Sequence, residues 1–172
     1  MTKNIEFKEY AKDIKLNLAT ILKTDPESNL QENQIYGIAL SCAYTTKNTD
    51  LVEFLLEKAA GKISEAEINA SKTASSIMAM NNIYYRFVHL VSDKEYLKMP
   101  AKLRMNIIGN PGIEKIDFEL YSLAVSAING CGLCIDSHVK QLVNSKIDKS
   151  TISHTIRISS VINATAQTLF IN

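Results

Sequence analysis

Two cysteines and a histidine stand close together in the stretch AINGCGLCIDSHV, which spans residues 127–139. Cys131 and Cys134 are three residues apart, and His138 follows four residues after the second cysteine. On a helix, these spacings bring the two sulfurs together and place the imidazole beside Cys134. Such a cluster can bind a metal ion, can cycle between dithiol and disulfide, or can be an incidental pair of core thiols.

The position of the cluster in the chain favours reactive thiols. Asn129-Gly130 indicates a helix stop, because glycine adopts the left-handed backbone conformation that follows many helix ends. A new helix is therefore expected from about Cys131, with both cysteines in its first turn. Unpaired backbone N–H groups and the helix dipole stabilise a thiolate there. A thiol beside an imidazole is also an arrangement that activates a nucleophile.

Glu119 is expected to join this site through the turn at residues 129–130. If the chain reverses there, the flanking helices run antiparallel, and Glu119 and His138 lie equally far from the turn. The segment around Glu119, DFELYSLAVSAI, is mostly apolar, so a carboxylate buried there needs a partner. The sequence therefore predicts a relay in which Glu119 orients His138, and His138 accepts the proton of Cys134.

Two arguments about which cysteine attacks a substrate point in opposite directions. Helix-end electrostatics favour Cys131, which is nearer the positive end of the dipole. Proximity to the imidazole favours Cys134. We assign the attack to Cys134, because a positioned base moves one particular proton whereas the dipole acts on both sulfurs.

Zinc binding is the main alternative, with Cys131, Cys134, His138 and Glu119 as ligands in a non-enzymatic, zinc-stabilised helical module. Structural zinc sites usually draw two ligand pairs from separate segments, and the chain has no second CxxC and no HxxxH. A thioredoxin-like fold would need a strand and a βαβ pattern around the motif, whereas the preceding segment is helical in pattern. We therefore favour redox chemistry without a bound metal.

The composition is that of an ordinary globular protein. Of 172 residues, 46% are hydrophobic and 22% are charged, and the net charge is +1. No basic run is interleaved with aromatic residues, as nucleic-acid binding would favour. No apolar run approaches the ~20 residues that cross a bilayer, and the amino-terminal stretch lacks the apolar segment of a signal peptide. We expect a cytoplasmic protein without nucleic-acid or membrane partners.

Helical periodicity predicts a single all-α domain over residues 1–172, with about seven to nine helices. A first helix is expected over residues 5–23 and is interrupted before Pro26. A third helix is expected to have Asp50 as its N-cap and to stop at Gly61.

The second half of the chain follows the same pattern. Ser64 and Glu67 form a capping box that opens a long helix, and residues 92–115 are the least regular stretch. A helix over residues 117–128 precedes the cysteine motif, and Asp148 caps the last helix.

Several residues outside the motif could carry chemistry, but each has a structural explanation. Cys42 lies in an apolar helical stripe and is expected to be a buried, inert thiol. His89 and His154 have no neighbours at ligand spacing and are expected to be structural or exposed. A core or subunit contact explains one further group better than a cofactor site does: Met78, Met80, Tyr84 and Tyr85.

These residues resemble the alkyl hydroperoxide reductase D family, within the carboxymuconolactone decarboxylase-like superfamily. The family pattern is a glutamate, a CxxC twelve residues later and a histidine four past the second cysteine, and it matches Glu119, Cys131, Cys134 and His138. The stretches EYAKDIKLNL, MNNIYYR, LRMNIIGNPGI and FELYSLAVSAINGC also look like this family. One departure is Leu133, which stands where family members often carry a second histidine.

The resemblance implies an antioxidant peroxidase and disulfide reductase that reduces organic hydroperoxides and assembles as a homotrimer. It implies that Cys134 forms a sulfenic acid, and that Cys131, the proton donor and resolving thiol, closes a Cys131–Cys134 disulfide. No bound cofactor is implied, because the reductant would be a dihydrolipoyl group on the lipoylated acyltransferase subunit of a 2-oxo acid dehydrogenase complex. The partner peroxiredoxin, alkyl hydroperoxide reductase C (AhpC), would be reduced as well. Lactone decarboxylation, found elsewhere in the superfamily, does not require a CxxC pair.

Overall fold

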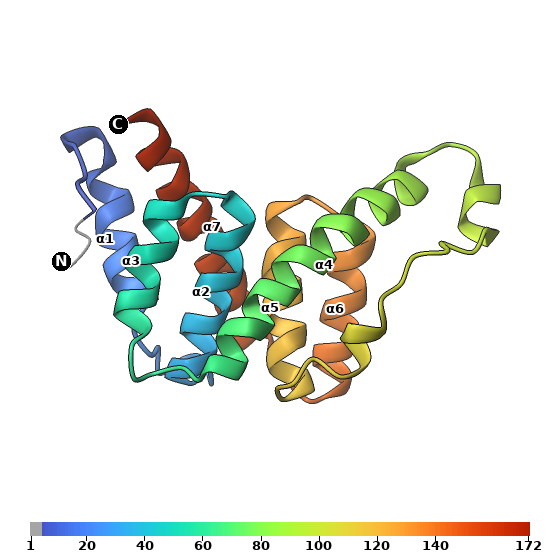
Figure 1. Ribbon diagram of the computed structural model, residues 1–172, viewed down its shortest axis with the longest axis horizontal. Coiled ribbons are helices and arrows are strands. Elements are labelled where there is room, and N and C mark those ends of the chain that lie inside the picture. Colours follow the sequence, from blue (N-terminus) through green and yellow to red (C-terminus); the bar gives the residue numbers. More distant parts are fainter. Residues whose placement is uncertain (1–4) are drawn as a thin grey trace.

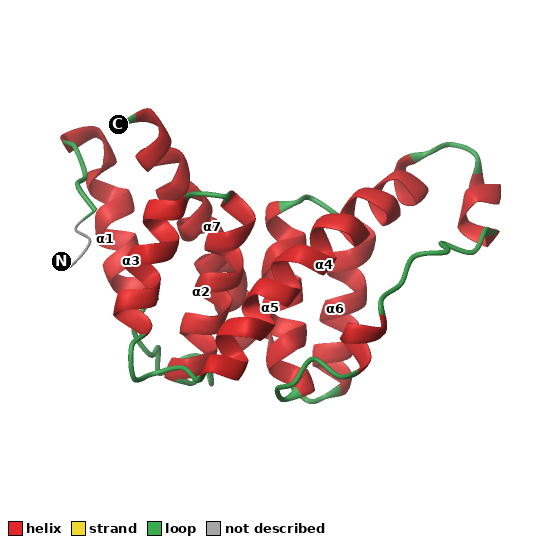
Figure 2. Cartoon of the chain, in the orientation of Figure 1, coloured by secondary structure: helices red, strands yellow, loops and turns green. Residues whose placement is uncertain are grey.

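The computed structural model describes residues 5–172, and all regular structure in this part of the chain is helical (Figure 2). The α-helices are α1 Lys12–Ile21, α2 Glu32–Thr46, α3 Thr49–Ala59, α4 Glu65–Leu90, α5 Lys115–Ile128, α6 Gly132–Asn144 and α7 Lys149–Ile171. Three short 3₁₀-helices are η1 Glu9–Ala11, η2 Lys94–Lys98 and η3 Asn106–Gly109. The prediction of an all-α fold is confirmed.

Helices α2 and α5 form the centre of the molecule, and the other helices surround them (Figure 1). Every residue of α2 from 35 to 43 is buried, as is every residue of α5 from 117 to 126. The two helices approach closely at Gly37, where an added Cβ would overlap the buried ring of Tyr121. Because α5 is buried all round, it carries Glu119 into the interior.

Two helix starts differ from the sequence-based expectation. The first α-helix begins at Lys12 and not at residue 5, because the chain forms the 3₁₀-helix η1 before it. The predicted N-cap at Asp50 is wrong, since the Asn48 side chain accepts the backbone N–H of Leu51 at 3.0 Å. Asparagine and aspartate cap helices about equally well. The left-handed backbone of Lys47 (φ 59°), which ends α2, makes Asn48 the first extended residue available.

Other predicted boundaries are confirmed. Ser64 and Glu67 form the expected capping box at the start of α4, and Asp148 caps α7. Gly61 follows α3 with a positive φ of 77°. The irregular stretch between α4 and α5, here called the arm (residues 91–114), projects from the helical body (Figure 1).

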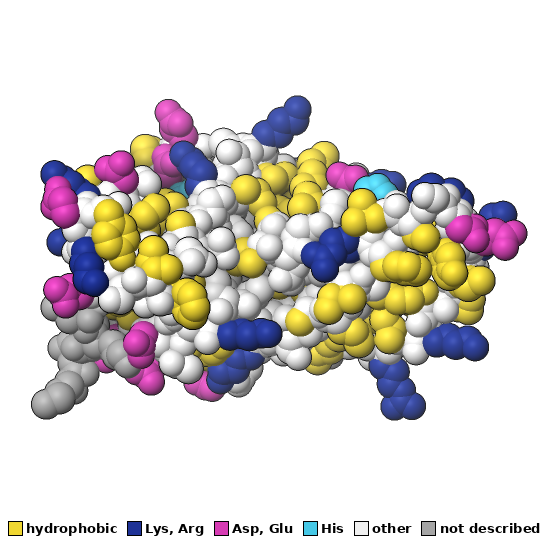
Figure 3. Space-filling model, turned by 90° about the horizontal axis from the view of Figure 1, so that it is seen from above, with side chains coloured by type: hydrophobic (Ala, Val, Ile, Leu, Met, Phe, Trp, Pro, Cys, Tyr) yellow, Lys and Arg dark blue, Asp and Glu magenta, His cyan; other side chains and the backbone are white. Residues whose placement is uncertain are grey.

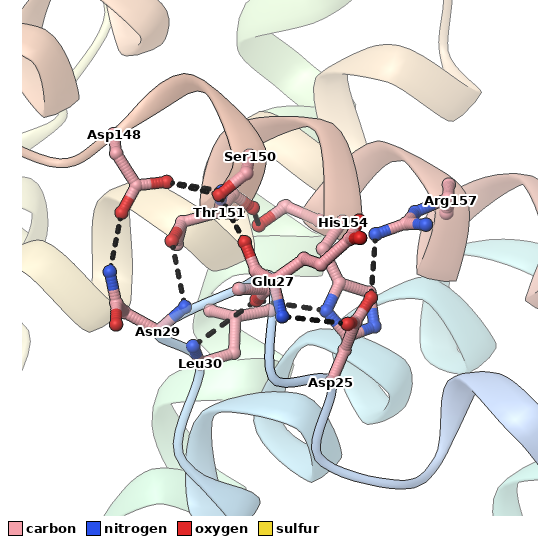
Figure 4. Close-up of polar contacts among 11 residues, drawn as sticks. Asp25, Glu27, Asn29, Leu30, Asp148, Ser150, Thr151, His154 and Arg157 are labelled. Atoms are coloured by element: carbon pink, nitrogen blue, oxygen red, sulfur yellow. Dashed lines mark hydrogen bonds and ion pairs between the residues drawn. The ribbon is translucent and has the colours of Figure 1, made fainter.

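The loop between α1 and α2 is fastened to the start of α7 (Figure 4). Asp148 accepts hydrogen bonds from the Thr151 backbone at 2.7 Å and from the Asn29 side chain at 2.6 Å. The Thr151 hydroxyl accepts the backbone N–H of Asn29 at 3.1 Å, and Arg157 pairs with Asp25 at 3.0 Å. These contacts close the loop over the first turns of α7.

His154 lies under this loop and is 3% exposed, with Nδ1 2.9 Å from the Ser28 hydroxyl. Its structural role agrees with the sequence-based expectation. Burial holds the pKa of His154 below its ordinary value, and the positive charge of Arg157 acts in the same direction, against the nearby Asp25 carboxylate.

This histidine should make stability depend on pH. In the unfolded chain it takes up a proton near pH ~6.5, whereas in the folded protein it resists protonation until a lower pH. The stabilising contribution is therefore complete above the unfolded-state pKa of about 6.5 and is lost as the pH falls from there toward the lower folded-state pKa. We expect the free energy of unfolding to drop by less than about 1.4 kcal/mol per pH unit as the pH falls below about 6.5. Urea denaturation should show a shallower dependence in His154→Gln; equal slopes in the two proteins would contradict the assignment.

Candidate active site

The turn between α5 and α6 reverses the chain as predicted at Asn129-Gly130. Gly130 has a φ of 67°, a conformation that glycine adopts without strain. The backbone N–H of Cys131 then donates to the Ser126 carbonyl at 3.2 Å. Cys131 is the N-cap of α6, and Cys134 lies in its first turn. Both cysteines are therefore at the start of a helix, as expected.

Cys131 and Cys134 form a disulfide, and their Cα atoms are 5.3 Å apart. The sulfur of Cys131 also accepts the backbone N–H of Cys134 at 3.3 Å. This N–H is one of the donors that a helix leaves unpaired at its amino end. A thiolate released at Cys131 on reduction would thus be stabilised by the start of α6.

Glu119 meets His138 across the antiparallel pair α5 and α6. The Glu119 Oε2 atom lies 2.7 Å from His138 Nδ1, and the two side chains are only 10% and 11% exposed. When the carboxylate accepts a hydrogen bond from Nδ1–H, Nε2 of the neutral imidazole is free to accept a proton from a substrate or a thiol. The predicted contact is confirmed, whereas the assignment of His138 as base and Glu119 as its orienting partner stays a prediction.

A cavity of about 520 Å³ joins these groups. Cys134, His138 and Glu119 border it, and Met78, Asn81 and Tyr85 of α4 form another part of its wall. Cys134 is 7% exposed, whereas Cys131 is fully buried and does not border the cavity. Of the two cysteines, Cys134 is therefore the one that a molecule in the cavity can reach. A larger groove of about 930 Å³, lined in part by α1 and α3, contains no cysteine or histidine.

Helix α4 also holds the cysteine turn in place. The Asn82 side chain accepts from the Asn129 side chain at 2.9 Å, and Arg86 donates to the Asn129 carbonyl at 2.6 Å. The imidazole of His89 lies against Gly132: a Cβ added to that glycine would be 3.5 Å from the ring. These three α4 residues are spaced i, i+4 and i+7, so they share one helix face.

Sequence reasoning missed several of these residues. It gave Asn82 and Arg86 no role, and it took Met78 and Tyr85 as core or subunit contacts, although both border the cavity. His89 is exposed, as one of the expected alternatives stated, but its contact with the cysteine turn was not foreseen. The sequence does show that Asn82, Arg86 and His89 share one face of a helix. That spacing does not show which part of the protein the face contacts.

The third cysteine is separate from the site. Cys42 is fully buried in α2, and burial raises the pKa of its thiol to about 12. It therefore stays protonated near neutral pH and is a poor nucleophile, as expected. Within residues 5–172, no group of three or more His, Cys, Asp or Glu side chains is arranged to hold a metal ion. The same residues contain no helix long and apolar enough to cross a membrane.

Comparison with known proteins places the chain in a family. Residues 94–170 match the model of the carboxymuconolactone decarboxylase family. A protein of Coxiella burnetii (strain RSA 493 / Nine Mile phase I) named alkyl hydroperoxide reductase AhpD is 58% identical over 159 residues, which are 92% of this chain and 90% of the relative. Proteins of the same name from Rhizorhabdus wittichii and Brucella anthropi are 52% and 49% identical over 158 residues, covering 92% of this chain and 90% and 89% of theirs. The chain belongs to the alkyl hydroperoxide reductase AhpD family.

The contact between Glu119 and His138 can be tested through the reactivity of Cys134. We expect Glu119→Gln to slow alkylation of the reduced thiol at neutral pH by about 10–100-fold, because the neutral amide orients the imidazole poorly and does not stabilise its charged form. The measurement is the rate of reaction with iodoacetamide across pH, with circular dichroism to verify folding. Glu114→Gln, at the exposed start of α5, is the control. A pH–rate profile identical to that of the unmodified protein would count against the relay.

Proposed function

We propose that this chain is a thiol-dependent alkyl hydroperoxide reductase that cycles through the Cys131–Cys134 disulfide. The observation that carries the proposal is a cavity bordered by both Cys134 and His138, with His138 held by Glu119 and with Cys131 buried away from it. The relatives' name, alkyl hydroperoxide reductase, supports peroxide reduction as the reaction.

The first step oxidises Cys134. His138 accepts the proton of the thiol, and the thiolate attacks the terminal oxygen of a hydroperoxide ROOH. A sulfur–oxygen bond forms, the oxygen–oxygen bond breaks, and the departing alkoxide takes the proton from His138 to give the alcohol ROH. Cys134 is left as a sulfenic acid.

The second step is resolution by Cys131. Its thiol condenses with the sulfenic acid, so the disulfide forms and one water molecule leaves. The N–H of Cys134 that contacts the Cys131 sulfur, 3.3 Å away, favours the thiolate needed for this attack. The disulfide is the oxidised state of the cycle.

The third step restores the dithiol. We propose a dihydrolipoyl group, carried by the lipoylated acyltransferase subunit of a 2-oxo acid dehydrogenase complex, as the reductant. Its thiolate attacks Cys134, the sulfur that borders the cavity, and Cys131 leaves as a thiolate at the start of α6. The second lipoyl thiol completes the exchange, so that ROOH and the dithiol become ROH, water and a cyclic disulfide. The same cysteine, in its reduced form, would reduce AhpC through a mixed disulfide.

We further propose that the chain assembles as a homotrimer. Apolar side chains are exposed along the end of α4 and on the arm, including Ile83 (66%), Leu90 (73%), Leu97 (51%) and Met99 (54%). Figure 3 shows apolar side chains gathered at the end of the molecule from which the arm projects. A large exposed apolar patch usually marks a surface that binds another molecule. Here, further copies of the chain would cover it.

The roles of the two cysteines predict different failures of their serine variants. We expect Cys134→Ser to abolish both peroxide-driven thiol oxidation and steady-state turnover of cumene hydroperoxide with dihydrolipoamide. Cys131→Ser should still react with peroxide, but its steady-state turnover should fall steeply, because the chain no longer has a neighbouring thiol to resolve the sulfenic acid. Cys42→Ala, which alters the buried thiol, is the control. If Cys134→Ser kept turnover while Cys131→Ser lost it, the assignment of the roles would be wrong.

A further inference from the structure

Asn81 is a buried polar residue whose side-chain oxygen has no hydrogen-bond partner among residues 5–172. It lies on α4 and is 5% exposed. Its neighbour Asn82, in contrast, bonds to Ser126 and Asn129, each at 2.9 Å. An unpaired buried amide oxygen destabilises the fold, so its presence calls for an explanation outside stability.

The position of Asn81 supplies that explanation. It borders the 520 Å³ cavity together with Cys134 and His138. Met78 and Tyr85, which lie close to one turn away on the same face of α4, contribute apolar or aromatic wall beside it. The Glu119 and His138 side chains are engaged with each other, so Asn81 offers a free buried amide on another wall of the cavity.

A hydroperoxide matches this amide chemically. The molecule has one O–H donor and two acceptor oxygens, and a primary amide offers one acceptor and two donors. We propose that Asn81 binds the hydroperoxide in front of Cys134, its amide turning toward the cavity so that the oxygen accepts the peroxide O–H and the nitrogen donates to the oxygen that departs. The inference rests on the proposed peroxide reduction and names a substrate-binding residue for it.

The proposed contact acts on the bond that breaks. As the Cys134 thiolate forms the sulfur–oxygen bond, negative charge develops on the departing oxygen, which finally takes a proton from His138. A donor held at that oxygen stabilises the charge where it develops. Reduction of the disulfide by a dithiol transfers charge between sulfurs and needs no such donor. Asn81 therefore serves the oxidation half-reaction and not the reduction half-reaction.

The two half-reactions can be measured separately by stopped-flow. We expect Asn81→Leu, which is similar in size but has no amide, to slow oxidation of the reduced protein by cumene hydroperoxide about 10–100-fold. Reduction of the oxidised protein by dihydrolipoamide should keep its rate. The melting temperature should equal or exceed that of the unmodified protein, because the unpaired amide is gone. Asn69→Leu, an exposed site on the same helix outside the cavity, should leave both rates unchanged.

The outcomes separate the inference from the function on which it rests. Oxidation of Asn81→Leu at the unmodified rate, or an equal loss in both half-reactions with a lower melting temperature, would overturn the role of Asn81 alone. Failure of the unmodified protein to react with the hydroperoxide would overturn the proposed function as well. If Asn81→Leu does not fold, Asn81→Ala is held to the same criteria, since it removes the amide without adding volume.

Discussion

The hydrogen bond between Glu119 and His138 connects the chemistry of this protein to its fold. Helix α5 is buried all round, and a lone carboxylate in such a helix would be costly. The chain reverses at Gly130 and lays α6 beside α5, which brings an imidazole to 2.7 Å from that carboxylate. The same reversal makes Cys131 the N-cap of α6. One turn therefore places the imidazole, its carboxylate partner and both sulfurs.

The two sulfurs then differ in accessibility as well as in electrostatics. Cys131 is fully buried and its sulfur accepts the backbone N–H of Cys134, whereas Cys134 borders the cavity. The two arguments about which cysteine attacks therefore no longer conflict. The helix start favours Cys131 as a leaving thiolate, and the cavity favours Cys134 as the residue that contacts the substrate. Helix α4 supports both, with one face on the cysteine turn and another on the cavity.

Local patterns predicted much of this arrangement. The capping box at Ser64, the cap at Asp148 and the stop at Gly130 are contacts between near neighbours in the chain, and each is confirmed. The contact of Glu119 with His138 followed from symmetry about a single turn. The cap of α3 was misassigned, because Asn48 and Asp50 are equally good caps and the backbone at Lys47 decides between them. The role of α4 could not be read from the sequence, since its partners lie more than forty residues away.

The central claim is that the sulfur of Cys134 reduces peroxide. Its most direct test is to treat the reduced Cys131→Ser variant with one equivalent of cumene hydroperoxide in the presence of dimedone, which labels sulfenic acids, and to locate the adduct by peptide mass spectrometry. We expect an adduct on Cys134. In the double variant that also carries Glu119→Gln, we expect much less of this adduct after a short reaction time. Absence of any adduct on Cys134, with peroxide left unconsumed, would contradict it.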